Sequence, residues 1–246
     1  MLAARTVTVG SRFNGPPGSG NGGYAAGLVA SALGSNPAVV TLKAPPPLDR
    51  PLTVERSNGG VVARNGDVVV AEAREGAVDV EPPPPVAFGQ AVAASERGPF
   101  ADAVSHPYPT CFVCGPLRAE GDGLRIFAGP IGEVYAAAWT PPAALAGPDG
   151  RMSDELVWAA LDCPSSGPVA NDAQRPGFLP IVLGRLAVRV DAPVVAGRPH
   201  VVMAWKLGIH GRKRASAAAL YSDDGALCAV ARALWIELAA PIGPAA

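Results

Sequence analysis

Short runs of alternating hydrophobic and polar residues, separated by turns rich in glycine and asparagine, fill the first third of this chain. Alternating valine and threonine predict a half-buried strand over residues 5–13. An alanine-rich stretch over residues 24–33 places apolar side chains on one helical face and stops at Gly34, which predicts a buried helix. Turns at Asn58-Gly59 and Asn65-Gly66 indicate antiparallel hairpins. The three or four strands predicted around them span residues 38–43, 52–56, 60–64 and 68–74.

Residues 82–109 interrupt this pattern. They open with four consecutive prolines and carry little periodicity, so they are predicted to form an extended linker. Beyond them a helix is expected over residues 154–162, ending before Pro164, because proline disfavours helical geometry in the residue that precedes it. A long loop should follow this helix. The predicted strands on either side of the helix and loop span residues 124–127, 133–139, 182–190, 200–209, 214–221 and 226–237.

The two parts of the chain share an order of elements and a short sequence pattern. Ala44-Pro45 followed by Arg50-Pro51 has the same spacing as Ala192-Pro193 followed by Arg198-Pro199, and each run joins two predicted strands. This coincidence favours a duplication. Each copy would be an antiparallel sheet around a central helix, which buries one face of each and gives an α+β fold. The expected division is 1–81, a linker over 82–109, and 110–246, with the two sheets paired edge to edge or packed helix against helix.

Composition narrows the classes of function. Hydrophobic residues make up 49% of the chain and charged residues 17%, so a sizeable core is expected. The formal net charge of −1 argues against a general binder of nucleic acid or of anionic membranes, since both need a concentrated positive field. No run of 18 uncharged apolar residues and no targeting segment is visible. Four cysteines are too few for a disulfide scaffold, so a cytoplasmic location is expected.

Two short motifs at the predicted helices carry a resemblance. Asn21-Gly22-Gly23 precedes the first helix, and Leu161-Asp162 closes the second. With the tail over residues 184–238, they resemble the hotdog-fold acyl-CoA thioesterases, and the duplication resembles their double-hotdog branch. The resemblance implies two antiparallel sheets, each wrapped around a central helix. It also implies an acyl-CoA substrate held between the helices, with no cofactor and no metal.

Single-hotdog members related to phenylacetyl-CoA thioesterase often open the helix with His-Gly-Gly and place a carboxylate nine positions after the histidine. Here Asn21-Gly22-Gly23 takes the first place, but Ala30 takes the carboxylate place. In the second half Asp162 takes the carboxylate place, and Ser153 lies nine residues before it. The resemblance therefore implies a single composite site, with Asn21, Gly22 and Gly23 from one half and Asp162 from the other as catalytic residues.

The chemistry of thioester hydrolysis agrees with this assignment. The first N–H groups of a helix lack intrahelical partners and lie at its positive end, so they can stabilise a developing oxyanion. Glycines allow the backbone to approach the substrate closely. A carboxylate on the facing helix can act as nucleophile or general base.

Further residues are candidates for substrate binding. Ser165 and Ser166 follow Asp162 and could position water, and Tyr24 follows the glycines. Arg212 and Arg214 could hold the phosphates of CoA, because arginine suits such anions. The sequence departs from the double-hotdog branch late in its last hotdog, where Arg232 and Ala233 lie near the place of a glutamine.

The segment Cys111-Phe112-Val113-Cys114-Gly115 contains a CxxC motif. Tetrahedral zinc needs four ligands, whereas Cys163 and Cys228 are isolated in the sequence and His106 is the nearest extra ligand. Buried thiols without metal are therefore expected. A metal site, including one shared between two chains, and a redox role remain alternatives.

Two other functions are compatible with the same fold. One is a non-catalytic acyl-CoA-binding protein, which the departures at residue 21 and at the glutamine place would suit. The other is a MaoC-like enoyl-CoA hydratase or dehydratase, which pairs an aspartate with a histidine, and no histidine lies near Asp162 in the sequence. A homo-oligomer of the double-hotdog unit is a further option.

Overall fold

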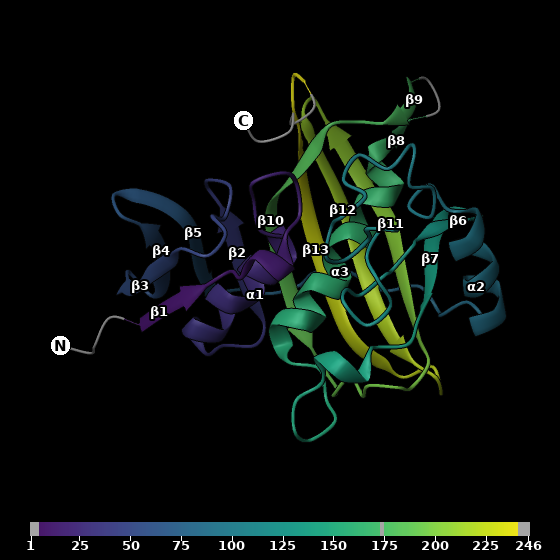
Figure 1. The fold of residues 1–246 in the computed structure, drawn as a ribbon, viewed down its shortest axis with the longest axis horizontal. Helices are drawn as coiled ribbons and strands as arrows, with labels where there is room; N and C mark the ends of the chain where they lie inside the picture. Colours follow the sequence, from purple (N-terminus) through teal and green to yellow (C-terminus); the bar gives the residue numbers. More distant parts are fainter. Residues whose placement is uncertain (1–4, 173–174, 241–246) are drawn as a thin grey trace.

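The structure is a computed structural model, and it describes residues 5–172 and 175–240. Its first part contains strand β1 and helix α1, followed by four strands (Figure 1). A single 3-10 turn, Ser11–Phe13, follows β1, so the strand predicted over 5–13 is shorter than expected. Helix α1 ends at Gly34, whose left-handed backbone (φ of 77°) suits glycine. The bounds are β1 Arg5–Thr8, α1 Gly22–Leu33, β2 Ala38–Leu42, β3 Pro51–Ser57, β4 Gly60–Asn65 and β5 Val68–Glu75.

The second part repeats this order, with one strand before a helix and four long strands after it. The predicted strands over 133–139 and after residue 181 are present. The bounds are α2 Phe88–Arg97, β6 Gly129–Ile131, β7 Val134–Trp139, a 3-10 turn at Ala143–Leu145, α3 Asp154–Ala170, β8 Asn171–Asp172, β9 Arg175–Phe178, β10 Ile181–Val190, β11 His200–His210, β12 Lys213–Ser222 and β13 Leu227–Glu237.

One antiparallel sheet contains all of these strands except the small β8–β9 pair. Its order is β1-β3-β4-β5-β2-β10-β13-β12-β11-β7-β6. Outward from the β2–β10 pair, the strands run β2, β5, β4, β3, β1 on one side and β10, β13, β12, β11, β7 on the other. Each side therefore has the strand before its helix outermost, the strand after its helix at the junction, and the last three strands between them. The two sides have the same topology, and β6 is an additional edge strand.

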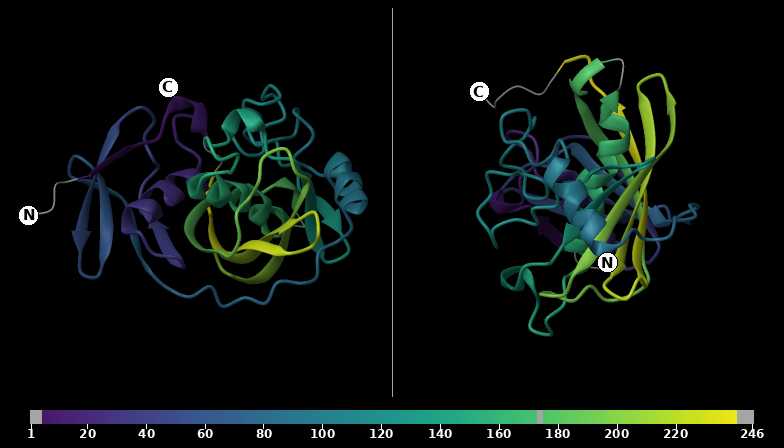
Figure 2. Two further views of the ribbon diagram at one scale, coloured as in Figure 1. Left: turned by 90° about the horizontal axis from the view of Figure 1, so that it is seen from below. Right: turned by 90° about the vertical axis from the view of Figure 1, so that its right-hand side faces the viewer.

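The predicted pair of sheets is thus one continuous sheet. Strands β2 and β10 pair edge to edge, with Ala38 opposite Val188 and Thr41 opposite Arg185. Each run of the repeated Ala-Pro and Arg-Pro pattern follows one of these strands, since residues 44–51 lead from β2 into β3 and residues 192–199 lead from β10 to β11. In Figure 2 the long strands β10–β13 curve around α3. Among the described residues, no helix is both long enough and apolar enough to cross a membrane.

Helices α1 and α3 pack directly against each other at the centre of the molecule. A Cβ on Gly27 would lie 2.5 Å from Cα of Glu155, and a Cβ on Gly23 would lie 3.1 Å from Cα of Ala159. The later residue of α1, Gly27, contacts the earlier residue of α3, Glu155, so the two helices run antiparallel. Glycine at these two positions permits the close approach.

Two sequence predictions are wrong within residues 82–127. The linker over 82–109 contains a helix, α2, whose small side chains Ala91 and Ala94 are buried against the outer face of β7 and β11. Residues 124–127 do not form a regular strand. The amides of Leu124 and Ile126 instead donate to the carbonyls of Phe112 and Val113, at 2.9 Å each, so this segment pairs with the CxxC turn.

The helix predicted to stop before Pro164 continues to Ala170. It contains Pro164 and Pro168, each of which removes one helical hydrogen bond. The hydroxyl of Ser165 donates to the Asp162 carbonyl and that of Ser166 to the Cys163 carbonyl, both at 2.7 Å, and Val169 and Ala170 are buried. Tertiary burial and these bonds outweigh the local preference of proline, and much of the expected loop is helical.

Candidate active site

Asn21 prepares the N-terminus of α1. Its side-chain Oδ1 accepts a hydrogen bond of 2.9 Å from the amide of Tyr24, which is a regular N-cap. The backbone N–H of Asn21 donates to the carbonyl of Phe13 at 2.7 Å. The side chain is buried, and its Nδ2 donates to Oδ2 of Asp162 at 2.9 Å. One residue thus caps α1 and also contacts the carboxylate of α3.

Asp162 receives a second hydrogen bond from the same helix N-terminus. The amide of Gly23 donates to Oδ2 of Asp162 at 2.8 Å. Oδ1 is buried and has no hydrogen-bond partner among the described residues. Burial raises the pKa of Asp162 to about 7, although the hydrogen bonds from Gly23 and Asn21 act in the opposite direction. A carboxylate with this pKa exchanges protons readily at neutral pH, which suits a general base.

A cavity of about 800 Å³ opens beside this pair of helices. Asn21, Gly22, Asp162 and Ser166 all lie on its wall. Most of the remaining wall is apolar and comes from both halves of the chain, including Leu42, Phe100, Phe178, Leu179, Ile181, Leu183 and Trp235. An apolar cavity with a few polar groups at one place is the usual form of a small-molecule site.

The amides of Gly22 and Gly23 have different positions. Gly22 lines the cavity and occupies the first helical position, where an N–H has no intrahelical acceptor. Gly23 does not line it, and its amide is used by Asp162. The sequence predicts both as donors to a substrate oxygen. In the structure Gly22 faces the cavity, and Gly23 orients the carboxylate.

Of the predicted substrate-binding residues, Ser166 lines the cavity and four others do not. Tyr24 is buried and stacks on Phe13, with ring centroids 3.8 Å apart, and burial raises its pKa to about 12. The hydroxyl of Ser165 accepts a bond of 3.1 Å from Nε1 of Trp235, behind the cavity wall.

The two predicted phosphate ligands are also away from the cavity. Nη2 of Arg214 pairs with Oε2 of Glu237 at 2.5 Å, and its Nη1 donates to the carbonyl of Val169 in the last turn of α3. This buried guanidinium therefore caps α3. Arg212 is exposed and donates from Nε to the main-chain carbonyl of Glu237 at 2.7 Å. Among the side chains that the structure describes, Lys43 is a cation that does line the cavity, and its Nζ lies 3.0 Å from Oε2 of Glu72.

Two residues that the sequence does not assign to the site belong to this region. Cys163 is predicted to be isolated, and this is wrong, because its Sγ lies 3.7 Å from Sγ of Cys111. His106 lines the same cavity as Asp162, although 56 positions separate them. Nδ1 of His106 accepts the amide of Tyr108 at 2.9 Å, and burial lowers the pKa of the ring. No local sequence signal announces that Cys111 and His106 lie beside α3, since the segment that carries them folds back over this helix.

Cys111, Cys114 and Cys163 form a cluster in which the thiols shift one another's pKa values. Hydrogen bonds from Cys114 and Cys163 hold the pKa of Cys111 well below its usual range. Burial, together with the hydrogen bond to Cys111, raises the pKa of Cys114. Cys228 lies elsewhere, on β13, and its thiol contacts the carbonyl of Ala226.

The second potential site has a different composition. Ala30 is buried on α1, and the first turn of α3 carries Asp154 and Glu155 in place of glycines. Glu155 packs against Gly27, one turn from Ala30. A carboxylate at residue 30 and a glycine-rich helix start are both missing from the sequence here.

Solved structures share this architecture. A candidate thioesterase from Novosphingobium aromaticivorans is 16% identical, with 95% of this chain and 94% of that chain covered and a TM-score of 0.60. The tesB protein of Mycobacterium avium subspecies paratuberculosis is 12% identical, with 88% of this chain and 86% of that chain covered and a TM-score of 0.56. A protein of unknown function with a hotdog fold from Alicyclobacillus acidocaldarius is 14% identical, with 96% of this chain and 93% of that chain covered and a TM-score of 0.53.

No protein-family model matches the sequence, and no curated protein matches it. At the identities above, the structural likeness shows the fold alone, which is the hotdog fold.

Proposed function

We propose that this chain is a double hotdog that hydrolyses acyl thioesters, with acyl-CoA as the substrate class, at one composite site between halves 1–81 and 110–246. The observation that carries the proposal is the contact of Asp162 with Asn21 and Gly23. These groups come from opposite halves, and they meet beside an apolar cavity of about 800 Å³. A carboxylate with a pKa of about 7 beside a helix N-terminus provides both a base and an oxyanion donor.

The proposed reaction uses the ionised form of Asp162. The carboxylate takes a proton from water as the water oxygen attacks the thioester carbonyl carbon, and the amide of Gly22 donates to the carbonyl oxygen as it becomes negative. Collapse of the intermediate breaks the C–S bond. Asp162 returns its proton to the departing thiolate, so the carboxylate is regenerated without net proton uptake at this residue. Direct attack by Asp162 on the carbonyl is the other route open to the same group.

The cavity also suggests where the two ends of the substrate lie. Its apolar wall suits an acyl chain. We assign Lys43 to the phosphates of CoA in place of Arg212 and Arg214, because Lys43 lines the cavity and is solvent-exposed. The opposite helix start, with Asp154 and Glu155, would repel an anionic intermediate, so one site per chain is proposed.

The decisive experiment measures free thiol release from a panel of acyl-CoAs by the full chain. Asp162→Asn keeps the shape of the side chain and removes the base, so kcat should fall by about 10²–10⁴-fold. Asp149→Asn is the matched control, because this carboxylate is solvent-exposed on a loop. Full activity in Asp162→Asn would overturn the site. Acyl-CoA binding without thiol release in the wild type would indicate the non-catalytic binding protein instead.

His106 gives one specific reason to test a second activity. It lies on the wall of the same cavity as Asp162, and a hydratase of the MaoC-like type pairs an aspartate with a histidine. The same preparations should be assayed with a 2-enoyl-CoA, following loss of the conjugated double bond while the thioester stays intact. Hydration that depends on both His106 and Asp162 would favour this alternative over hydrolysis.

The remaining parts of the proposal rest on the sequence. The near-zero net charge supports a small-molecule substrate over nucleic acid or membrane partners. A cytoplasmic location and assembly into homo-oligomers remain predictions.

A further inference from the structure

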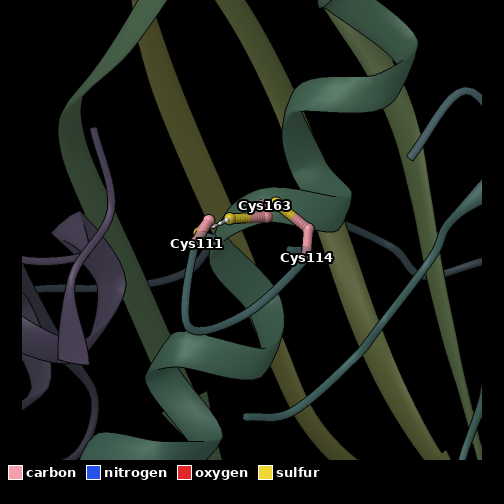
Figure 3. A group of neighbouring side chains, drawn as sticks. All are labelled: Cys111, Cys114 and Cys163. Atoms are coloured by element: carbon pink, nitrogen blue, oxygen red, sulfur yellow. Dashed lines mark hydrogen bonds between the residues drawn. The ribbon is translucent and has the colours of Figure 1, made fainter. Parts of the chain in front are cut away.

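Three cysteine side chains converge on one point (Figure 3), and all three residues line the cavity. Cys111 and Cys114 come from the CxxC turn, and Cys163 comes from the residue after Asp162 in α3. Among the described residues, their sulfur atoms form a group in which every pair lies within 4.8 Å. We propose that these three thiols bind one thiophilic metal ion per chain, of the Zn²⁺ class.

The sulfur separations agree with a shared metal. A tetrahedral zinc site with Zn–S bonds of ~2.3 Å places its sulfur atoms about 3.8 Å apart. Sγ of Cys111 lies 3.7 Å from Sγ of Cys163. A covalent S–S bond needs roughly 2.05 Å, so the same pair would have to move much closer to form a disulfide. The three thiols therefore need little rearrangement to hold a metal.

The CxxC turn is held in a fixed shape by its backbone. The amide of Gly115 donates to the carbonyl of Cys111 at 2.9 Å, which closes a tight turn around the two cysteines. A Cβ at Gly115 would lie 2.5 Å from that carbonyl oxygen, so the turn requires glycine. The amide of Phe112 donates to the carbonyl of Asn14, and Leu124 and Ile126 bond to the turn from the other side. A tight turn that fixes two cysteine thiols commonly supplies two of the four ligands of a zinc site.

Cys163 supplies the third thiol from a rigid element. It lies in the middle of α3, where Ser166 donates its hydroxyl to the Cys163 carbonyl. Nδ2 of Asn21 also lies 3.7 Å from Sγ of Cys163, so a donor already faces this sulfur. Such hydrogen bonds to ligand atoms are typical of metal sites. The metal would then tie the long irregular segment around the CxxC turn to the central helix.

The donor set selects the class of metal. Three thiolates favour zinc and other soft ions over magnesium or calcium, which prefer oxygen ligands. Binding replaces the thiol protons, which pass to solvent, so affinity should increase with pH. All three cysteines line the cavity, which leaves the fourth tetrahedral position for water or a ligand that enters from it.

The test uses the reduced full chain, freed of metal by a chelator that is then removed. Titration with Co²⁺ reports thiolate ligation through sulfur-to-cobalt charge-transfer absorption and tetrahedral visible bands, and Zn²⁺ should then displace the cobalt. We expect one equivalent per chain in the wild type. Cys163→Ser should weaken metal binding by at least about 100-fold. This is more than the loss of a group that only hydrogen-bonds a metal ligand would cause. Cys228→Ser is the matched control, because this buried cysteine lies outside the group.

Circular dichroism establishes that each variant is folded. If Cys163→Ser does not fold, the cobalt titration of the wild type decides the proposal by itself. Absence of thiolate-to-cobalt absorption in the wild type would overturn the proposal. Equal affinity in Cys163→Ser and Cys228→Ser would do the same. A chain that is two hydrogens lighter by mass and takes up no metal would show a disulfide instead. None of these measurements uses a thioester, so their outcome is independent of the proposed hydrolysis.

Discussion

The amide of Gly23 donates to Oδ2 of Asp162 across the two central helices, and the pair is in such close contact that a Cβ on Gly23 would lie 2.4 Å from Cβ of Asp162. One glycine therefore serves both packing and chemistry. Its missing side chain lets α1 and α3 approach, and the same approach brings a helix N-terminus to the carboxylate. The site exists only because the two halves are in direct contact.

Gly23→Ala should destabilise the chain. The added methyl would also lie 2.8 Å from the carbonyl of Trp158, so the helices must separate, and overpacking of this kind costs about 1–3 kcal/mol. Gly89→Ala is the matched control, since residue 89 is an exposed helical position with open space around its Cβ. That change should stabilise by about 0.5–1 kcal/mol, because alanine has the higher helix propensity. Urea unfolding measures both, and equal effects would contradict the packing described for Gly23.

The pH dependence of hydrolysis should follow Asp162. Because a general base must be ionised, kcat/KM should increase with pH and level off above the pKa of about 7. Asn21→Ser keeps an N-cap side chain but removes the donor Nδ2. Loss of a hydrogen bond to the ionised form raises a pKa, so the midpoint of the profile should move to higher pH. An unchanged midpoint, with α1 still folded by circular dichroism, would show that Asn21 does not position Asp162.

Asp162 should also make stability depend on pH. Its folded pKa of about 7 is above its ordinary value of 3.8, so the folded state binds more protons between these values. The contribution is complete below about pH 4 and is lost as pH increases through about 7, by up to about 4 kcal/mol at ~1.36 kcal/mol per unit. Asp162→Asn cannot titrate. The decrease in unfolding free energy from about pH 5 to 8 should be smaller in this variant, and an identical decrease would mean that other groups cause it.

Arg214 should contribute to stability and not to CoA binding. Its buried ion pair with Glu237 and its bond to the Val169 carbonyl are both lost in Arg214→Ala, and breaking a buried pair costs about 3–5 kcal/mol. The exposed pair of Arg198 with Asp223 is the control, because Arg198→Ala should cost below about 1 kcal/mol. Thermal unfolding separates the two. A folded Arg214→Ala chain with normal stability and an increased KM for acyl-CoA would restore the phosphate role.

The strands and α1 could be predicted because their signals are local. Alternation of apolar and polar residues over residues 52–56, and the alanine-rich run that stops at Gly34, report burial over a few neighbouring residues. The end of α3 could not be predicted this way. Proline at 164 and 168 argues for a break, and only the burial of the surrounding helix outweighs that local preference.

The sequence by itself determined the α+β class and most strands, because these depend on periodicity, whereas the candidate glycines at the start of α1 and Asp162 follow from the resemblance to the hotdog-fold thioesterases. Only the tertiary structure decided that Gly23 holds the carboxylate while Gly22 faces the cavity, that Arg214 caps α3, and that Cys163 lies beside Cys111. Each of these contacts joins residues far apart in the chain. The packing of the helices against each other and against the sheet brings these partners together. The local sequence pattern does not specify which distant residues meet.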